Sequence, residues 1–150
     1  MTDTPMNSEP VFSGPWQGWN ASESTGPFTD LLGRIYWRVD GPDVLTGIDV
    51  RPEHANNLGI IHGGFTMSLL DTGMFFVCWQ QAGILRVMTL QATTDFLEPG
   101  RPGMPLVSRG RIVRETGRLV WLNGFVEQEE RRIASWHGIM RKIGPEKAPA

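Results

Sequence analysis

Asp71 is the residue with the clearest potential for chemistry, because its carboxylate interrupts the apolar stretch LLDTGMFF. An ionised carboxylate is costly to place among such neighbours unless polar partners or solvent compensate it. Two interpretations are open at this stage. Either Asp71 points into a solvated crevice or bonds a nearby backbone group, or it is held there as a functional group.

The tripeptide His62-Gly63-Gly64 lies just ahead of this stretch, and Gly63 precedes Asp71 by eight positions. If a helix begins here, its first backbone N–H groups lack partners and carry the positive end of the helix dipole. Such groups can hold a negative oxygen that develops on a carbonyl carbon, and glycine lets a ligand come close to them. The alternative for the two glycines is a tight turn that binds nothing.

One helix cannot bring both features to the same reacting carbon. Eight residues of helix rise about 12 Å, which separates Gly63 from Asp71 of the same chain. A two-fold dimer with two such helices side by side would place Asp71 of one subunit opposite Gly63 of the other. The spacing therefore predicts a homodimer with two equivalent sites shared between subunits.

The elements around these residues indicate the fold class. Residues 63–82 have helical length, end before Gly83 and carry apolar side chains on nearly every side, which predicts a central helix wrapped by other structure. A short helical turn, FTDLLG, and a hairpin with the turn Gly41-Pro42-Asp43 precede it. Four strand-like runs follow, which we expect to form a meander: RVMTLQATTDFLEP, MPLVSRGRIVRE, RLVWLNGFVEQ and RRIASWHGIMRK. This order predicts an α+β fold, with an antiparallel sheet curled around one long helix.

The two ends of the chain are expected to lie outside this domain. Residues 1–27 are rich in Pro, Gly, Ser and Thr, which predicts an irregular arm whose Trp16 and Trp19 can still dock onto the domain. The domain itself is expected over residues 28–143, and residues 144–150 are expected to form a C-terminal tail.

Composition argues against several classes of protein. The 150 residues fit one domain, 20% of them are charged, and the net charge of -2 is unlike the basic surface of a nucleic-acid binder. The N-terminus lacks a secretory signal, and polar residues interrupt the most apolar window, residues 65–79, so neither export nor membrane insertion is expected. The lone Cys78 permits no disulfide framework or thiolate cage, which fits a reducing, cytoplasmic location.

The stretch NNLGIIHGGFTMSLLD, followed by TTDFLEPGRPG, resembles the phenylacetate-degradation (PaaI-like) type of hot-dog acyl-CoA thioesterase. The resemblance covers roughly residues 51–142. Its signature is an Asn, then HGG, then an acid eight residues beyond the first glycine, and a later strand that ends in Pro and Gly. It implies a hot-dog fold, an acyl-CoA substrate, and a homo-oligomer that is a dimer or a dimer of dimers.

The resemblance also implies roles for individual residues. Asp71 would act as a nucleophile or as a general base for water, while the Gly63 amide polarises the thioester carbonyl. His62 and Asn56 would position the thioester, the leaving sulfur or the attacking water. Thr89 occupies a place where some relatives carry a hydroxyl that orients water. The alternatives are a capping histidine for His62 and an ordinary strand threonine for Thr89.

Two further residues are candidates for substrate contact. Gly64 would let the substrate approach the helix terminus, and Phe75 would line an acyl pocket, although an aromatic residue on a buried helix is more often part of the core. We expect no metal site, because His54 and His62 lack partners in ligand spacing. No cofactor is expected either, since coenzyme A is part of the substrate.

Two other functions are compatible with the same fold. A non-catalytic acyl-CoA binding or sensing protein would keep the glycine turn and the pocket, but it would have no need for Asp71. The second is hydration or dehydration of an acyl thioester. The spacing of Asp71 from Gly63 favours hydrolysis over this reaction. The leading hypothesis is therefore hydrolysis of acyl-CoA to a free acid and CoA.

Overall fold

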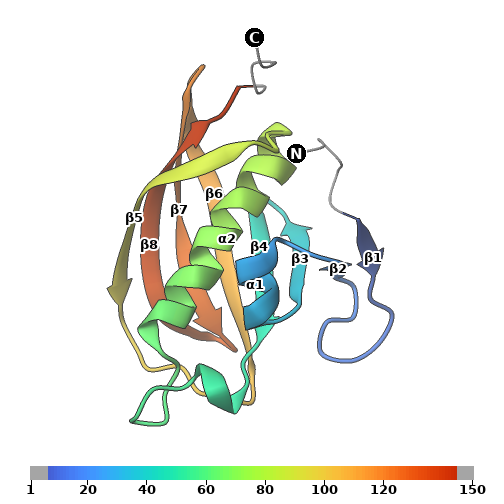
Figure 1. Cartoon of the computed structure of the whole chain (residues 1–150), viewed down its shortest axis with the longest axis vertical. Helices are drawn as coiled ribbons and strands as arrows, with labels where there is room; N and C mark the ends of the chain where they lie inside the picture. The colour runs from blue at the N-terminus through green and yellow to red at the C-terminus, as the bar shows by residue number, and fades with distance from the viewer. Residues whose placement is uncertain (1–6, 145–150) are drawn as a thin grey trace.

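The computed structural model describes residues 7–144, so the first six residues of the expected arm and residues 145–150 of the expected tail lie outside the described range. Figure 1 shows one long helix lying across a curved sheet. The elements in chain order are β1 (Ser8–Pro10), β2 (Asn20–Ser22), α1 (Pro27–Leu32), β3 (Ile35–Asp40), β4 (Asp43–Asp49), the short 3-10 helix η1 (Pro52–His54), α2 (Gly63–Ala82), β5 (Val87–Phe96), β6 (Pro105–Glu115), β7 (Leu119–Gln128) and β8 (Arg131–Lys142).

The strands form one antiparallel sheet in the order β1-β2-β3-β4-β6-β7-β8-β5. The predicted α+β architecture is confirmed, but the expected four-stranded meander is wrong in one respect. Strands β6, β7 and β8 are consecutive neighbours, whereas β5 pairs with β8 at the far edge of the sheet. The reason is that α2 crosses the sheet after β4 and delivers the chain to the opposite edge, which leaves room for three strands in between (Figure 1).

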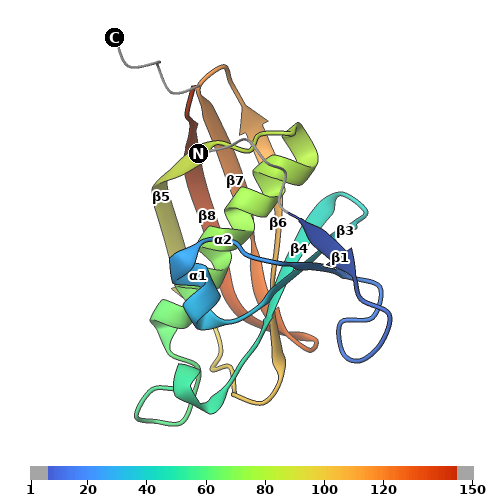
Figure 2. The same cartoon turned by 45° about the vertical axis from the view of Figure 1, so that its right-hand side comes forward.

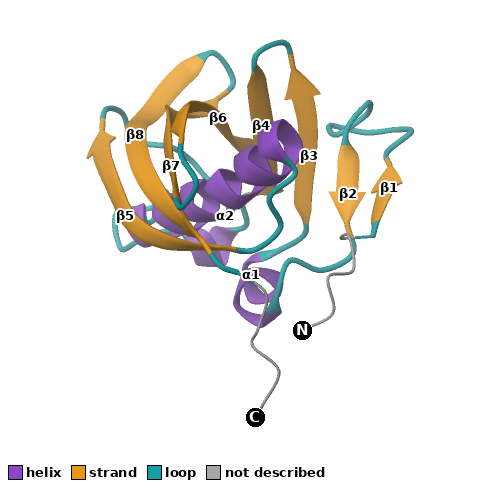
Figure 3. Ribbon diagram, turned by 90° about the horizontal axis from the view of Figure 1, so that it is seen from above, coloured by secondary structure: helices purple, strands orange, loops and turns teal. Residues whose placement is uncertain are grey.

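Helix α2 begins and ends where its sequence signals predict. The side chain of His62 caps its N-terminus, and Gly83 ends it in the left-handed conformation, with φ of 66°. One side of the helix packs into the concave face of the sheet, as the view from above in Figure 3 shows. Its fully buried residues include Leu70, Met74 and Phe76, which join Ile48, Leu106, Val120 and Leu122 from the strands in the main core.

The sheet does not wrap the whole circumference of α2. Gly64, Met67 and Asp71 follow each other at helical spacing and are exposed, although the apolar sequence predicts a helix covered on nearly every side. Figure 2 shows α1 in front of α2, on the side of the helix that faces away from the sheet. The neighbouring edge strand β5 also exposes apolar side chains, with Met88 47% and Leu90 52% accessible. Apolar side chains of α2 and of β5 are therefore uncovered in the single chain.

The N-terminal segment differs from the irregular arm that its composition predicts. Strand β2 pairs with β3, and β1 pairs with β2, so the segment extends the sheet by two short strands. The expected docking of the tryptophans is confirmed: Trp16 is 4% exposed, its ring stacks on Tyr36 at 4.5 Å, and its Nε1 donates to Asp49 at 2.9 Å. A Cβ on Gly47 would lie 2.3 Å from the Trp16 ring, so glycine makes room for this contact.

No helix within residues 7–144 is both long enough and apolar enough to cross a membrane.

Candidate active site

Asp71 lies in the middle of α2 and is bonded by Thr89 from β5. The Thr89 hydroxyl donates to Asp71 Oδ1 at 2.6 Å, and Asp71 itself is exposed. Both residues line a cavity of ≈ 300 Å³, whose other walls are Thr25, Thr29, Thr72, Phe75, Val87 and Met140. The carboxylate is thus oriented at the mouth of a cavity and remains open to solvent, which answers the question of what compensates its charge.

A β-bulge in β5 directs the Thr89 side chain toward the helix. Thr89 is paired with Met140 of β8 and the next paired residue is Gln91, so Leu90 is the extra residue. As a result Thr89 and Ala92 are both partly buried, although regular alternation would turn them to opposite faces of the strand. The sequence gives no signal for this bulge.

Gly63 is the first residue of α2, and its backbone N–H is available. It donates no hydrogen bond within the part of the chain that the structure describes. A Cβ at this position would lie 3.1 Å from Cζ of Phe96, so a side chain would crowd the space in front of the helix terminus. An unpaired N–H at the positive end of a helix dipole is suited to bind a carbonyl oxygen that gains negative charge.

His62 and Gly64 bond to each other at the helix terminus. The N–H of Gly64 donates to His62 Nδ1 at 2.9 Å, which is the capping arrangement considered as the alternative for this histidine. The N–H of Gly64 is therefore occupied, and contact between Gly64 and a substrate stays a prediction that rests on its missing side chain. The cap distinguishes the two glycines, because it satisfies Gly64 and leaves Gly63 free.

Asn56 lies near Gly63, in the loop before α2. Its Oδ1 accepts hydrogen bonds from the N–H groups of Leu58, at 2.9 Å, and Ile60, at 3.4 Å, which fixes the turn. Its Nδ2 donates no hydrogen bond to any other described residue. Asn56 and Gly63 line the same cavity, of ≈ 470 Å³, so this amide can serve as a second donor there.

The remaining walls of this second cavity include residues that sequence reasoning did not single out. They come from the loop before α2, from α2 itself, from the end of β5 with the loop that follows it, and from β8: Ile60, Ile61, Thr66, Phe96, Leu97, Glu98, Pro99, Gly100 and Ile133. The loop after β5 was recognised as a Pro-Gly motif, but its place beside the helix terminus depends on the tertiary fold.

The two cavities have no lining residue in common. One contains Gly63 and Asn56, and the other contains Asp71, Thr89 and Phe75. This is the separation that the eight-residue spacing predicts. Phe75 is half-buried and contacts the core residue Phe76 edge-on at 5.5 Å, so it contributes to both the core and the cavity wall. Within one chain, the structure brings together each group of candidates but not the two groups.

Cys78 and His54, the other side chains with potential reactivity, are buried and held by structural contacts. Cys78 is 0% exposed, and burial raises the pKa of its thiol to about 12, so the thiol stays protonated. Within residues 7–144 there is no group of three or more His, Cys, Asp or Glu side chains that could hold a metal ion. His54 is buried against the Phe65 ring at 3.9 Å, and its Nδ1 accepts the backbone N–H of Arg51 at 3.0 Å.

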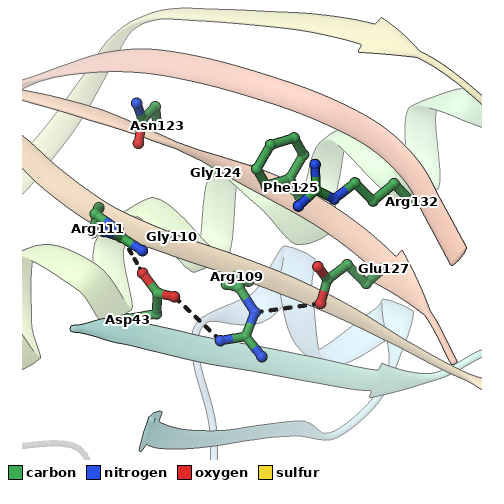
Figure 4. Close-up of a pocket in the computed structure, with 9 residues that line it drawn as sticks. All are labelled: Asp43, Arg109, Gly110, Arg111, Asn123, Gly124, Phe125, Glu127 and Arg132. Atoms are coloured by element: carbon green, nitrogen blue, oxygen red, sulfur yellow. Dashed lines mark hydrogen bonds and ion pairs between the residues drawn. The ribbon is translucent and has the colours of Figure 1, made fainter. Parts of the chain in front are cut away.

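A polar hollow of ≈ 530 Å³ lies on the outer face of the sheet, with α2 behind the strands (Figure 4). Arg109 and Arg111 from β6 line this hollow. Asp43 bonds both of them, at 3.2 and 2.6 Å, and Glu127 also bonds Arg109, at 3.3 Å. These carboxylates neutralise the guanidinium groups, and the strands separate them from the face that carries Asp71 and Gly63.

An antiparallel sheet curled around one long helix is the hot-dog fold. A sequence model described as the thioesterase superfamily matches residues 58–135, which is more than half of the chain. The chain therefore belongs to the thioesterase superfamily. A Pseudomonas aeruginosa protein that carries an esterase assignment is 24% identical over 141 residues, which cover 93% of this chain and 97% of that protein.

Solved structures show the same fold. PaaI from the phenylacetic acid degradation operon of Escherichia coli has a TM-score of 0.71 and 23% identity, covering 80% of this chain and 86% of that one. A Streptococcus pneumoniae protein described as a hypothetical thioesterase, solved with coenzyme A, has a TM-score of 0.63 and 21% identity, covering 71% and 83%. The expected resemblance to PaaI-like hot-dog proteins is confirmed at the level of fold and family.

Proposed function

We propose that this protein hydrolyses acyl-CoA thioesters to a free acid and CoA, with Asp71 as the catalytic carboxylate. The observation that carries the proposal is the Asp71 carboxylate itself, held by Thr89 at the mouth of a cavity yet accessible to a substrate. A residue kept only to stabilise the helix would have no need of that cavity. Membership of the thioesterase superfamily supports the same class of reaction.

The active site is proposed to form between two copies of the chain. Gly63 and Asp71 line separate cavities on α2, and the exposed apolar residues Met67, Met88 and Leu90 lie on α2 and on β5. Exposed apolar side chains on a helix and on an edge strand are typical of a protein interface. Two-fold pairing there would set the Gly63 cavity of one subunit beside the Asp71 cavity of its partner and bury the apolar residues.

In the proposed reaction the thioester carbonyl oxygen accepts a hydrogen bond from the Gly63 N–H of one subunit. Asp71 of the other subunit either removes a proton from the attacking water or attacks the carbonyl carbon itself. In the first case a C–O bond to water forms and the C–S bond breaks, and the proton passes from Asp71 to the leaving thiolate. In the second case the C–S bond breaks as an acyl anhydride forms on Asp71; water then hydrolyses the anhydride, which frees the Asp71 carboxylate, and the proton released from water passes to the thiolate. Both paths yield one acid and one thiol.

Asn56 and Thr89 have supporting roles in this proposal. The free Nδ2 group of Asn56 would donate to the substrate on the Gly63 side of the site. The Thr89 hydroxyl keeps Asp71 in one rotamer, so that the carboxylate is oriented before the substrate arrives. His62 acts through its cap on Gly64, which leaves the N–H of Gly63 directed at the substrate.

A non-catalytic acyl-CoA binding protein is the second candidate function. The cavities would serve binding as well as hydrolysis, and the S. pneumoniae relative was solved with coenzyme A. The bonded and accessible Asp71 favours the enzyme, because binding a thioester, whose carbonyl is an acceptor, gives no use for a carboxylate beside it.

The test is release of free CoA from aryl, short-chain, medium-chain and long-chain acyl-CoA by the parent protein and by Asp71→Asn. We expect selective turnover by the parent and a loss of about 100-fold or more in kcat in the variant. Asp95→Asn is a matched control, since Asp95 is also exposed but lines a different hollow on the sheet. If the protein binds acyl-CoA but hydrolyses none of the substrates, the proposed enzyme function fails and the binding function stands.

A further inference from the structure

Gln128, the last residue of β7, is the most completely buried amide side chain of the chain described, with 1% of its surface exposed. Its Oε1 accepts from the N–H of Arg101 at 2.8 Å. Its Nε2 donates to the carbonyl of Arg101 at 2.8 Å and to that of Met104 at 3.3 Å. Both hydrogens and the oxygen of the amide are therefore bonded to the backbone of the loop between β5 and β6.

This loop cannot easily satisfy the hydrogen bonds of its own backbone. It contains Pro99 and Pro102, which have no N–H to donate, and residues 97–104 form neither helix nor strand. Backbone groups buried in such a loop need partners from elsewhere, because an unpaired one is costly. Gln128 supplies three hydrogen bonds and holds Arg101 as a neighbouring strand would.

The loop in turn contacts the segment that leads into α2. The carbonyl of Gly100 accepts the N–H of Ile61 at 2.9 Å, and Ile61 lies two residues before Gly63. Gly100 is buried, and a Cβ on it would lie 2.7 Å from Ile61 Cδ1, so glycine lets this loop pack directly against the Ile61 side chain. Pro99 and Gly100 also line the cavity that contains Gly63 and Asn56.

We propose that Gln128 is a positioning residue for the active site, which sets the place of the Gly63 N–H through the loop at Gly100 and the backbone of Ile61. The inference rests on the proposed function, because it assigns the Gly63 N–H to the substrate carbonyl. Gln128 lines neither cavity and touches no substrate; it fixes one wall of the Gly63 cavity and the entry of the chain into α2. A displacement of about 1 Å in such a donor is enough to slow a reaction strongly.

The kinetic test compares Gln128→Met with Gln81→Met in the full chain. Methionine keeps the length of the side chain and removes all three hydrogen bonds. Gln81 is a matched control because its amide also bonds a backbone N–H and a carbonyl, of Ile112 and Pro42, but at the other end of α2. We expect kcat for acyl-CoA to fall about tenfold or more in Gln128→Met with little change in KM, and both constants to stay near the parent values in Gln81→Met. An unchanged kcat in folded Gln128→Met overturns the proposal.

A second measurement separates this proposal from the proposed function. Amide hydrogen exchange, measured by NMR, should show the Ile61 N–H exchanging at least tenfold faster in Gln128→Met, while amides in the middle of β7 are unaffected. If Gln128→Met does not fold, Gln128→Glu, which keeps the acceptor for the Arg101 N–H, replaces it in both experiments. If the parent protein has no thioesterase activity, the proposed function fails, and Ile61 exchange alone decides the link. Parent-like exchange at Ile61 would show that Gln128 does not position this segment.

Discussion

The hydroxyl of Thr89 donates a 2.6 Å hydrogen bond to the carboxylate of Asp71, and this bond joins the edge strand β5 to the central helix. It uses one lone pair of Oδ1 and leaves the other oxygen, Oδ2, without a hydrogen bond to any described residue. A carboxylate held in this way has one oxygen fixed and one available for a proton or a carbonyl carbon.

Removal of this hydroxyl should slow the reaction without unfolding the protein. In Thr89→Val the side chain keeps its shape but loses the donor, and we expect kcat to fall by about 10- to 100-fold, the range for a hydrogen bond to a charged group. Thr89→Ser keeps the donor and should retain most of the activity. Steady-state CoA release measures both, and equal rates in the two variants would mean that the bond has no part in catalysis.

A side chain at position 63 should obstruct the substrate carbonyl. The Cβ of Gly63→Ala would lie 3.1 Å from the ring of Phe96, at the entrance to the free N–H. We expect kcat/KM to fall about tenfold or more, because the carbonyl oxygen is displaced from its donor. Gly117→Ala is the control, since a Cβ there meets no atom within 4 Å. The prediction is contradicted if both alanine variants match the parent.

Subunit mixing tests whether the two groups of residues act across an interface. Asp71→Asn and Gly63→Val are each expected to be inactive as homodimers. In hybrids, the unaltered Gly63 of one subunit would face the unaltered Asp71 of the other, which restores one of two sites in half of the molecules. Co-refolding equal amounts should therefore recover about a quarter of the parent activity. Recovery of none, in hybrids detected by mass spectrometry, would place the site within one chain.

The stability of the protein should depend on pH through His54. Burial, and then the charge of Arg51, lowers the pKa of this imidazole from its ordinary value near 6.5. The unfolded chain thus binds a proton at a higher pH than the folded one, so the free energy of unfolding should decrease as pH falls through 6.5. Denaturant unfolding between about pH 7.5 and 5.5 measures this slope. His54→Gln should reduce it, and a slope identical to the parent's would assign it to other groups.

The local part of the fold could be predicted from the sequence, because its signals are local. The bounds of α2 follow from the His62 cap and from Gly83, and strands β3 to β8 follow from their alternation, whereas the short β1 and β2 were not predicted. The neighbours of β5 could not be predicted in this way, since alternation gives the faces of a strand but not its place in a sheet. That place depends on α2, which carries the chain across the sheet before β5 begins.

The candidate site could be predicted only where it is encoded in short motifs. The HGG turn and Asp71 are visible as motifs in the sequence. Thr89 and Asn56 became candidates only through the resemblance to a known family. The bulge at Leu90 that turns Thr89 toward Asp71 depends on pairing with β8, which no local pattern reports. Gln128 lies at the end of a strand beside charged residues, so its burial under the loop after β5 is a tertiary effect.

The two edges of the sheet have opposite properties. At one edge, β1 has three residues and ends in Pro10, which lacks an N–H; at the other, β5 has ten residues with apolar side chains exposed. A short strand with proline is a poor template for another strand, whereas a long one is a good template. If two copies join through β5, the only sheet edge left on each side is the short strand β1. The contact that builds an active pair therefore cannot add further copies to form a fibre.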